Sequence, residues 1–166
     1  MANACVFCKK VHDYNRETAF QILRKTPDTL RELLDGVHLQ TLSRKPSEKE
    51  WSPRQILIHL IDTEFAYGFR YRVIMAEKEP NLTPYDQNSW VDHFSYGEQD
   101  ATQLIRAFTP LRRVNLELLQ TVDPALFDKP GKHPEYGTIT VAQMIPHLAA
   151  HDLKHLEQIR DRIPAV

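Results

Sequence analysis

Three histidines recur at four-residue intervals in the stretch HLAAHDLKHLEQIRDRI, residues 147–163. Residues four apart on a helix lie one above the other on the same face. His151 and His155 share the apolar face of this segment, so two imidazole nitrogens could bind one metal ion, as in HExxH helices. The alternative is a buried helix whose histidines are polar core residues, each satisfied by a hydrogen bond.

A third ligand must come from another segment, and His59 is the candidate. It lies on the inner stripe of a predicted helix, together with Ile56, Thr63 and Tyr67. Burying three neutral imidazoles is costly unless each ring nitrogen has a partner, and one shared ion satisfies three nitrogens at once. The sequence therefore predicts a metal site made of His59, His151 and His155.

His147 could pair with His151 on spacing alone. It lies closer to the positive end of the helix dipole, which disfavours a cation, and it follows Pro146. We therefore predict that His147 lies near the site and lines the pocket without being a ligand. Three histidines plus water suit zinc, nickel, iron or manganese, with zinc and nickel as the first choices.

Long segments of the chain follow the helical period, and few alternate with period two. Four helices are expected, at residues 15–36, 53–76, 95–121 and 140–162. Three of them begin with a capping box, at Ser52/Gln55, Ser95/Glu98 and Thr140/Gln143. The first helix is expected to be interrupted at Thr26-Pro27, with Pro27 starting a new helical segment. This pattern predicts an all-α four-helix bundle with long loops, spanning residues 15–166 as one domain after a tail at 1–14.

Composition narrows the function classes. The 166 residues carry a net charge of −1, and no basic block is interleaved with aromatics, so a nucleic-acid role is not expected. No apolar run approaches the length of a membrane helix, and the first residues do not resemble a signal peptide. A cytoplasmic protein is the expectation, with a small molecule as its substrate.

Both cysteines lie in the stretch CVFC, where Cys5 and Cys8 have the spacing of a redox motif or of zinc ligands. A structural zinc site needs four ligands, and the sequence offers no second cysteine pair. A thioredoxin-like motif needs a βαβ context, which the sequence does not predict. The expectation is a short tail that carries two thiols.

The ligand candidates belong to a longer pattern. It consists of Trp51-Ser52, His59-Leu60, Asp62 and Glu64 in one helix, then Thr140, His151, His155 and Gln158-Ile159 in another. With the stretches YDQNSW and LRRVNLELL, this pattern resembles the DinB/YfiT-like superfamily, in its second DinB-type subfamily, over residues 15–162. The resemblance implies a four-helix bundle, often dimeric, with metal ligands at His59, His151 and His155.

Members of that family include proteins assigned as metal-dependent hydrolases and thiol S-transferases that use bacillithiol, mycothiol or glutathione. The expected function is therefore a divalent-metal-dependent enzyme, a hydrolase or a thiol S-transferase, with a low-molecular-weight thiol as one candidate substrate. The alternative is a non-catalytic bundle that binds a metal or a small molecule.

Further residues could support the site. Asp62 and Glu64 could orient the imidazoles, or could instead form salt bridges with an arginine such as Arg70 or Arg72. Tyr85 and Asp86, with Trp90, lie in the long loop after the second helix, which could cap the site.

Overall fold

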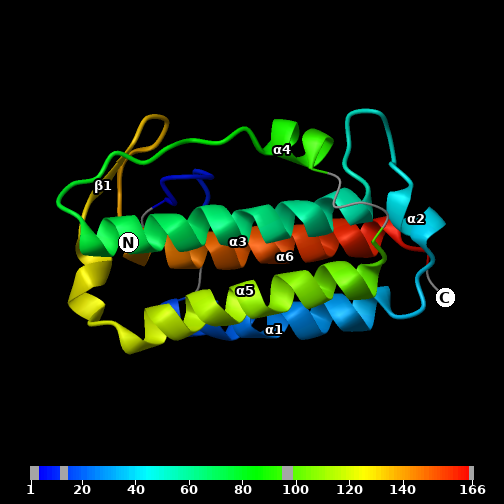
Figure 1. Ribbon diagram of the computed structural model, residues 1–166, viewed down its shortest axis with the longest axis horizontal. Coiled ribbons are helices and arrows are strands. Elements are labelled where there is room, and N and C mark those ends of the chain that lie inside the picture. Colours follow the sequence, from blue (N-terminus) through cyan, green and yellow to red (C-terminus); the bar gives the residue numbers. More distant parts are fainter. Residues whose placement is uncertain (1–3, 12–14, 95–98, 165–166) are drawn as a thin grey trace.

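The computed structural model describes residues 4–11, 15–94 and 99–164, and it confirms a mostly helical fold. Its elements, in chain order, are α1 (Arg16–Leu34), α2 (Leu39–Ser43), α3 (Pro53–Ala76), α4 (Gln87–His93), α5 (Ala101–Thr121), the 3₁₀ helix η1 (Pro124–Asp128), β1 (Gly131–His133), β2 (Gly137–Ile139) and α6 (Val141–Arg162). The four long helices α1, α3, α5 and α6 form the bundle that the sequence predicts (Figure 1). No helix in the described part of the chain is long and apolar enough to cross a membrane.

The order of the helices explains the longest connection. Helices α1 and α6 run in one direction and α3 and α5 run in the other, and α1 packs against α5 and α6 while α3 packs against the same two (Figure 1). Because α3 and α5 are parallel neighbours, the chain must return along the whole bundle between them. The returning segment, described over residues 77–94 and 99–100, carries α4, which packs against α3. This topology places a loop above the middle of the bundle.

Local sequence predicts correctly where α3 and α6 begin, but the predicted start of α5 is wrong. The capping boxes at Ser52/Gln55 and Thr140/Gln143 are present as predicted. Ser95 and Glu98 lie outside the described residues, and the third long helix begins at Ala101 with Asp100 and Gln103 as its capping box. The stretch SYGEQDATQ contains two successive candidate boxes, at residues 95–98 and 100–103, and the prediction named the first.

The predicted interruption of the first helix is wrong, because α1 is continuous and Pro27 lies inside it. Proline lacks the N–H that would bond to the carbonyl of residue 23. The guanidinium of Arg112 in α5 donates to that carbonyl, Leu23 O, at 2.9 Å. A contact with another helix therefore replaces the hydrogen bond that Pro27 removes, which is why α1 continues where the sequence predicted a break.

The β-hairpin and the short helices α2 and α4 were not predicted. Strands β1 and β2 pair antiparallel with Gly131 opposite Ile139, over three residues each, too short for a period-two pattern to be visible. The hairpin also holds the start of the returning loop. Leu82 N–H donates to Lys132 O and Lys132 N–H donates to Pro80 O, both at 2.8 Å. The loop and hairpin thus form one wall beside α3.

Candidate metal centre

Helices α3 and α6 bring three imidazoles together in the bundle interior. His59 Nε2 lies 2.8 Å from His151 Nε2, and His155 Nε2 lies 3.1 Å from the same atom. The side chains of His59 and His155 are buried, and His151 is partly exposed. The three rings could therefore hold one metal ion with three nitrogen ligands.

Proton counting favours a cation among these nitrogens. His155 Nδ1 lies 2.7 Å from Gln158 Oε1, so Nδ1 carries the proton and Nε2 presents a lone pair. His151 Nε2 cannot donate a well-directed proton to both neighbours, so one of the two short contacts lacks a proton between its nitrogens. His59 Nδ1 is also buried without a hydrogen bond. A shared metal ion would convert three crowded lone pairs into three bonds.

The separations are compatible with one shared ion. For metal–nitrogen bonds of about 2.0–2.1 Å, neighbouring ligands lie between about 2.9 Å apart at right angles and about 3.4 Å apart at the tetrahedral angle. The nitrogen–nitrogen distances of 2.8 and 3.1 Å lie near the lower end of that range. Three histidine ligands would leave further positions of the ion for water or substrate.

The buried ligands are neutral bases. Burial, reinforced by the neighbouring imidazoles, lowers the pKa of His59 to about 2 and that of His155 to about 3. At neutral pH these two rings therefore carry lone pairs that protons do not occupy. This is the state that metal ligation requires.

Two contacts orient the rings, and neither role was predicted from the sequence. Gln158 holds His155 from one helical turn further along α6. The Trp51 ring packs on His59, with centroids 4.8 Å apart, and stacks on His155 at 6.3 Å. The i, i+3 spacing of His155 and Gln158 was a usable signal. The contact of Trp51 with His155 of α6 depends on tertiary structure.

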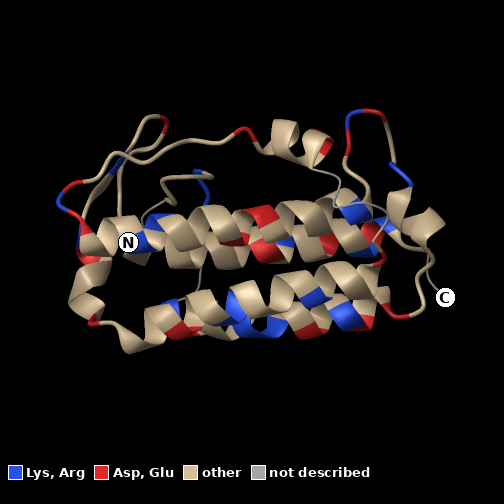
Figure 2. Ribbon diagram, in the orientation of Figure 1, with Lys and Arg blue, Asp and Glu red and all other residues tan. Residues whose placement is uncertain are grey.

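A buried charge network lies behind the histidines and joins all four long helices. Arg112 Nη1 lies 2.6 Å from Asp152 Oδ2 of α6, and Arg112 Nη2 lies 2.8 Å from Glu64 Oε1 of α3. Figure 2 shows acidic segments on α3 and α6 opposite basic segments of α5. Thr26 of α1 donates to Asp152 at 2.7 Å. Burial alone would raise the pKa of Asp152, but the charge and hydrogen bonds of Arg112 hold that pKa well below its usual range.

Glu64 forms a salt bridge, but with Arg112 and not with Arg70 or Arg72, the partners expected from the sequence. It also accepts from Asn115 Nδ2 at 2.9 Å. The link from this network to the metal centre is Asp152, whose Oδ1 lies 3.9 Å from His151 Nδ1. Asp152 was not among the predicted site residues, although it directly follows His151 in the sequence.

A cavity of about 590 Å³ adjoins His151, between α3, α6, the hairpin and the returning loop. His147, Tyr85 and Asp86 line it, and so does Arg70. Asp86 also caps α4 by accepting from the N–H groups of Asn88 and Ser89. A second hollow of about 410 Å³ borders His151 and His155 on the other side, under the same start of α4. The returning loop therefore covers the centre and leaves an opening on each side.

Arg70 is a buried cation in the wall of the larger cavity, with 6% of its surface exposed. Its Nη2 donates to Thr83 O at 3.0 Å and lies 3.2 Å from His133 Nε2. Within the described residues, no carboxylate oxygen lies within 4.0 Å of its guanidinium nitrogens. Its charge is therefore available to an anion in the cavity.

Tyr85 and Asp62 lie on the same side of α3. Asp62 is buried, three residues after His59. Burial raises the pKa of Tyr85, while a hydrogen bond with Thr63 and the charge of Arg70 oppose this shift and the Asp62 carboxylate adds to it. Tyr85 lines the cavity beside Thr63. Trp90 packs against the Tyr85 ring, with centroids 4.6 Å apart.

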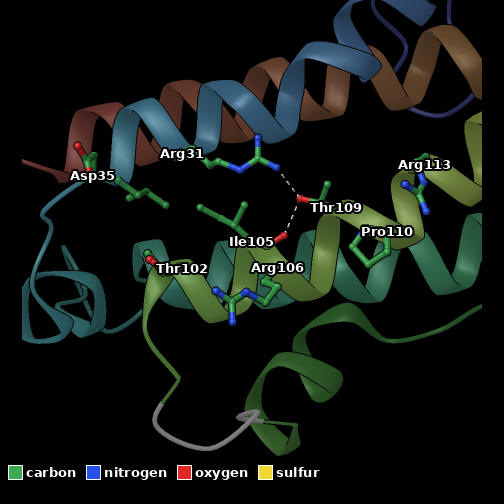
Figure 3. A pocket seen from close by; sticks show the side chains of 10 residues that line it. Arg31, Asp35, Thr102, Ile105, Arg106, Thr109, Pro110 and Arg113 are labelled. Carbon is green, nitrogen blue, oxygen red and sulfur yellow. Dashed lines mark hydrogen bonds between the residues drawn. The ribbon is translucent and has the colours of Figure 1, made fainter.

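Another hollow, of about 530 Å³, lies between α1 and α5, away from the histidines (Figure 3). Arg31, Arg106 and Arg113 line it, and Arg31 donates to Thr109 Oγ1 at 3.3 Å. Among the residues that the structure describes, no histidine or cysteine lines it. It offers charge and space but no metal ligand beyond the carboxylate of Asp35, so it lacks the donors that a metal centre needs.

Comparison with known proteins agrees with this geometry. Residues 22–159 match the sequence model of the DinB superfamily. The chain belongs to the DinB superfamily. Two relatives of this chain are each named "Putative metal-dependent hydrolase". The one from Oceanobacillus iheyensis is 27% identical over 135 residues, covering 80% of this chain and 77% of its own. The one from Bacillus mycoides is 26% identical over 147 residues, covering 86% and 84%.

The solved structure of YfiT from Bacillus subtilis has the same fold. It superposes with a TM-score of 0.81 at 20% sequence identity, covering 93% of this chain and 89% of YfiT. YfiT is described as a probable metal-dependent hydrolase with an unusual four-helix bundle topology. At this identity the match establishes the fold alone, and the chemistry must be argued from the residues of the site.

Proposed function

We propose that this DinB-superfamily protein is a divalent-metal-dependent hydrolase whose centre is His59, His151 and His155. The observation that carries the proposal is the convergence of three Nε2 atoms at 2.8 and 3.1 Å beside a cavity of about 590 Å³. An ion held on one face by three neutral imidazoles keeps open positions, where it makes a bound water or thiol acidic near neutral pH. The names of the relatives support the same class of reaction.

The protein side chains supply orientation and substrate binding. Gln158 holds His155 in the tautomer that presents Nε2, and Trp51 covers the rings from the side away from the larger cavity. The carboxylates of Asp152 and Glu64 are engaged by Arg112, so they act as a fixed frame behind the rings. Within the cavity, Tyr85 offers a hydroxyl donor and Arg70 offers a positive charge. We infer from Arg70 that the substrate carries an anionic group.

Thiol S-transfer is the second candidate, and one observation favours it. The hydrogen bonds of the three ligand rings, as far as the described residues show, go to each other and to Gln158, and none of them goes to a carboxylate that could act as a general base. Hydrolysis of an ester or amide also needs a group that moves a proton to the leaving alcohol or amine, whereas a thiol that metal ligation has deprotonated needs no base before it attacks. Low-molecular-weight thiols such as glutathione also carry carboxylates that Arg70 could bind.

The test combines metal analysis with a substrate screen. The experiment compares wild type with His151→Ala and with a control, His38→Ala, which removes a histidine distant from the centre in the sequence. Each protein is stripped of metal with a chelator and reloaded with zinc, nickel, iron or manganese. Each is then assayed with esters, amides and pairs of a thiol and an electrophile. Metal-dependent turnover that is lost only in His151→Ala supports an enzyme, and the productive substrate separates hydrolysis from thiol transfer.

The other outcomes of the same experiment contradict the proposal in different ways. One equivalent of metal that wild type binds and His151→Ala loses, with no turnover in any assay, favours the alternative function, a non-catalytic protein that binds a metal or a small molecule. No metal in wild type after reloading means that the three histidines are polar core residues.

A further inference from the structure

The N-terminal segment brings a second set of metal ligands to α6. Cys5, Cys8 and His147 each place a ligand atom within 4.8 Å of the others. Cys5 Sγ lies 3.5 Å from His147 Nδ1, across 142 residues of sequence. We propose that these three side chains form a second metal site, for zinc or another thiophilic divalent ion, distinct from the three-histidine centre.

The backbone of the CVFC segment folds as a compact turn. Residues 6–8 form the turn, Lys9 N–H donates to Cys5 O at 2.9 Å, and Cys5 N–H donates to Lys10 O at 2.8 Å. Lys9 adopts a φ of 60°, a left-handed conformation that is costly for a residue with a side chain. The chain accepts this conformation in a turn that brings the two thiols close to each other and to His147.

Packing fixes the turn on the bundle. Val6 and Phe7 pack against the core cluster of α1, α3 and α6. The Phe7 ring stacks on His147, with centroids 4.4 Å apart, and meets the edge of Tyr136 at 5.1 Å. Yet none of residues 4–11 is fully buried. A metal crosslink to α6 would add the stabilisation that such limited burial does not provide.

The geometry and the ligand types both suit zinc. With a metal–sulfur bond of about 2.3 Å and a metal–nitrogen bond of about 2.0–2.1 Å, ligands at the tetrahedral angle lie about 3.5–3.6 Å apart. The observed separation of Cys5 Sγ and His147 Nδ1 is 3.5 Å. Two thiolates and one imidazole make a softer ligand set than three imidazoles, so the two sites should differ in metal preference. Three protein ligands also leave a fourth position for water or an external ligand.

The two centres are neighbours on α6. His147 lies one turn before His151, with ring centroids 6.4 Å apart, and both rings line the cavity of about 590 Å³. Each imidazole faces a different set of donors, His147 toward Cys5 and His151 toward His59 and His155. This division explains why a third histidine with the same four-residue spacing lies beside the three-histidine centre without joining it.

Cobalt reports on the two sites separately, because thiolate ligands give cobalt a charge-transfer absorption in the near ultraviolet and imidazoles alone do not. Full-length reduced protein is stripped, titrated with Co²⁺ and then analysed for metal content. We expect two equivalents per chain and a thiolate charge-transfer band in wild type. Cys5→Ser and Cys8→Ser should each lose the band and one equivalent, and should keep the other equivalent.

Two further variants complete the test. His59→Ala should keep the thiolate band, because it disrupts only the three-histidine centre. His147→Ala should weaken the cobalt affinity of the thiolate site by more than about tenfold, since even loss of a residue that only supports a metal ligand costs about 10- to 100-fold. Circular dichroism of each variant verifies the fold.

One equivalent of cobalt without a thiolate band in wild type would overturn the proposal. So would an unchanged band in Cys8→Ser, or a Cys5–Cys8 disulfide that persists in protein kept under reducing conditions.

Discussion

The guanidinium of Arg112 donates a 2.9 Å hydrogen bond to the carbonyl of Leu23, the carbonyl that Pro27 leaves without its helical partner. The same side chain binds the carboxylates of Glu64 and Asp152. One arginine of α5 therefore supplies the hydrogen bond that α1 lacks at Leu23 O and neutralises the buried carboxylates of α3 and α6. Since Asp152 is adjacent to His151, this arrangement also lies directly behind the three histidines of the candidate metal centre.

Arg112→Met should destabilise the protein by about 3–5 kcal/mol, because it leaves two buried carboxylates and one carbonyl without their cation. Urea unfolding at neutral pH measures the change. The control is Arg113→Met, which removes the neighbouring exposed arginine and should change stability by less than about 0.5 kcal/mol. A loss below about 1 kcal/mol for Arg112→Met would show that the network contributes little to folding.

The bundle was predictable from the sequence because its signals are local. Capping boxes at Ser52 and Thr140 and the helical spacing of apolar residues depend only on neighbours in the chain. The close approach of His151 and His155 was predictable for the same reason, because the two residues lie one turn apart on α6. His59 could be paired with them only through its place on an inner stripe and through the family resemblance.

Long-range contacts account for what the sequence did not predict. The continuity of α1 through Pro27 depends on Arg112, which lies on another helix, and Glu64 bonds to Arg112 where a nearby arginine was expected. The contact of Cys5 with His147 joins the two ends of the chain. No window of sequence contains both members of such a pair, so propensity and spacing could not predict them.

Gln158→Leu should weaken metal binding at the three-histidine centre by about 10- to 100-fold, because His155 loses the acceptor that fixes its Nδ1 proton and ring orientation. Gln158→Glu keeps an acceptor at that place and should retain most of the affinity. Competition with a chromogenic chelator gives the dissociation constants. Glu157→Ala, at the exposed neighbouring position, is the control. Equal affinities for Gln158→Leu and wild type would mean that the contact does not position the ligand.

The stability of metal-free protein should fall as the pH drops below about 6.5. The pKa of His59 is lowered to about 2 and that of His155 to about 3, so between these values and about 6.5 the unfolded chain binds more protons than the folded chain. Each of the two histidines then contributes up to about 1.4 kcal/mol of lost stability per pH unit. The contribution of each neutral histidine to the free energy of unfolding is fully present above the pKa of the unfolded chain, and it is lost as the pH falls toward the pKa of the folded protein.

Urea unfolding of the metal-free protein from about pH 7 to about pH 5 measures this slope. His155→Gln should show a shallower slope than wild type, while His93→Gln, which replaces an exposed histidine, should show the same slope. Wild-type stability that does not change over this range would contradict the buried, neutral state of the two rings.

Arg70→Met should weaken the binding of anionic ligands in the larger cavity, since it removes the buried cation in the cavity wall. With the metal-loaded protein, calorimetric titration with glutathione, which carries carboxylates, should give an affinity at least about tenfold lower than wild type, as expected for a lost charge-assisted hydrogen bond. The uncharged thiol 2-mercaptoethanol should bind both proteins alike, because it engages only the metal centre. Lys132→Met, which removes an exposed cation on β1, is the matched control and should leave both affinities unchanged. Equal weakening of the two thiols by Arg70→Met would indicate a general disturbance of the cavity, and no weakening of either would show that Arg70 does not recognise the anionic group.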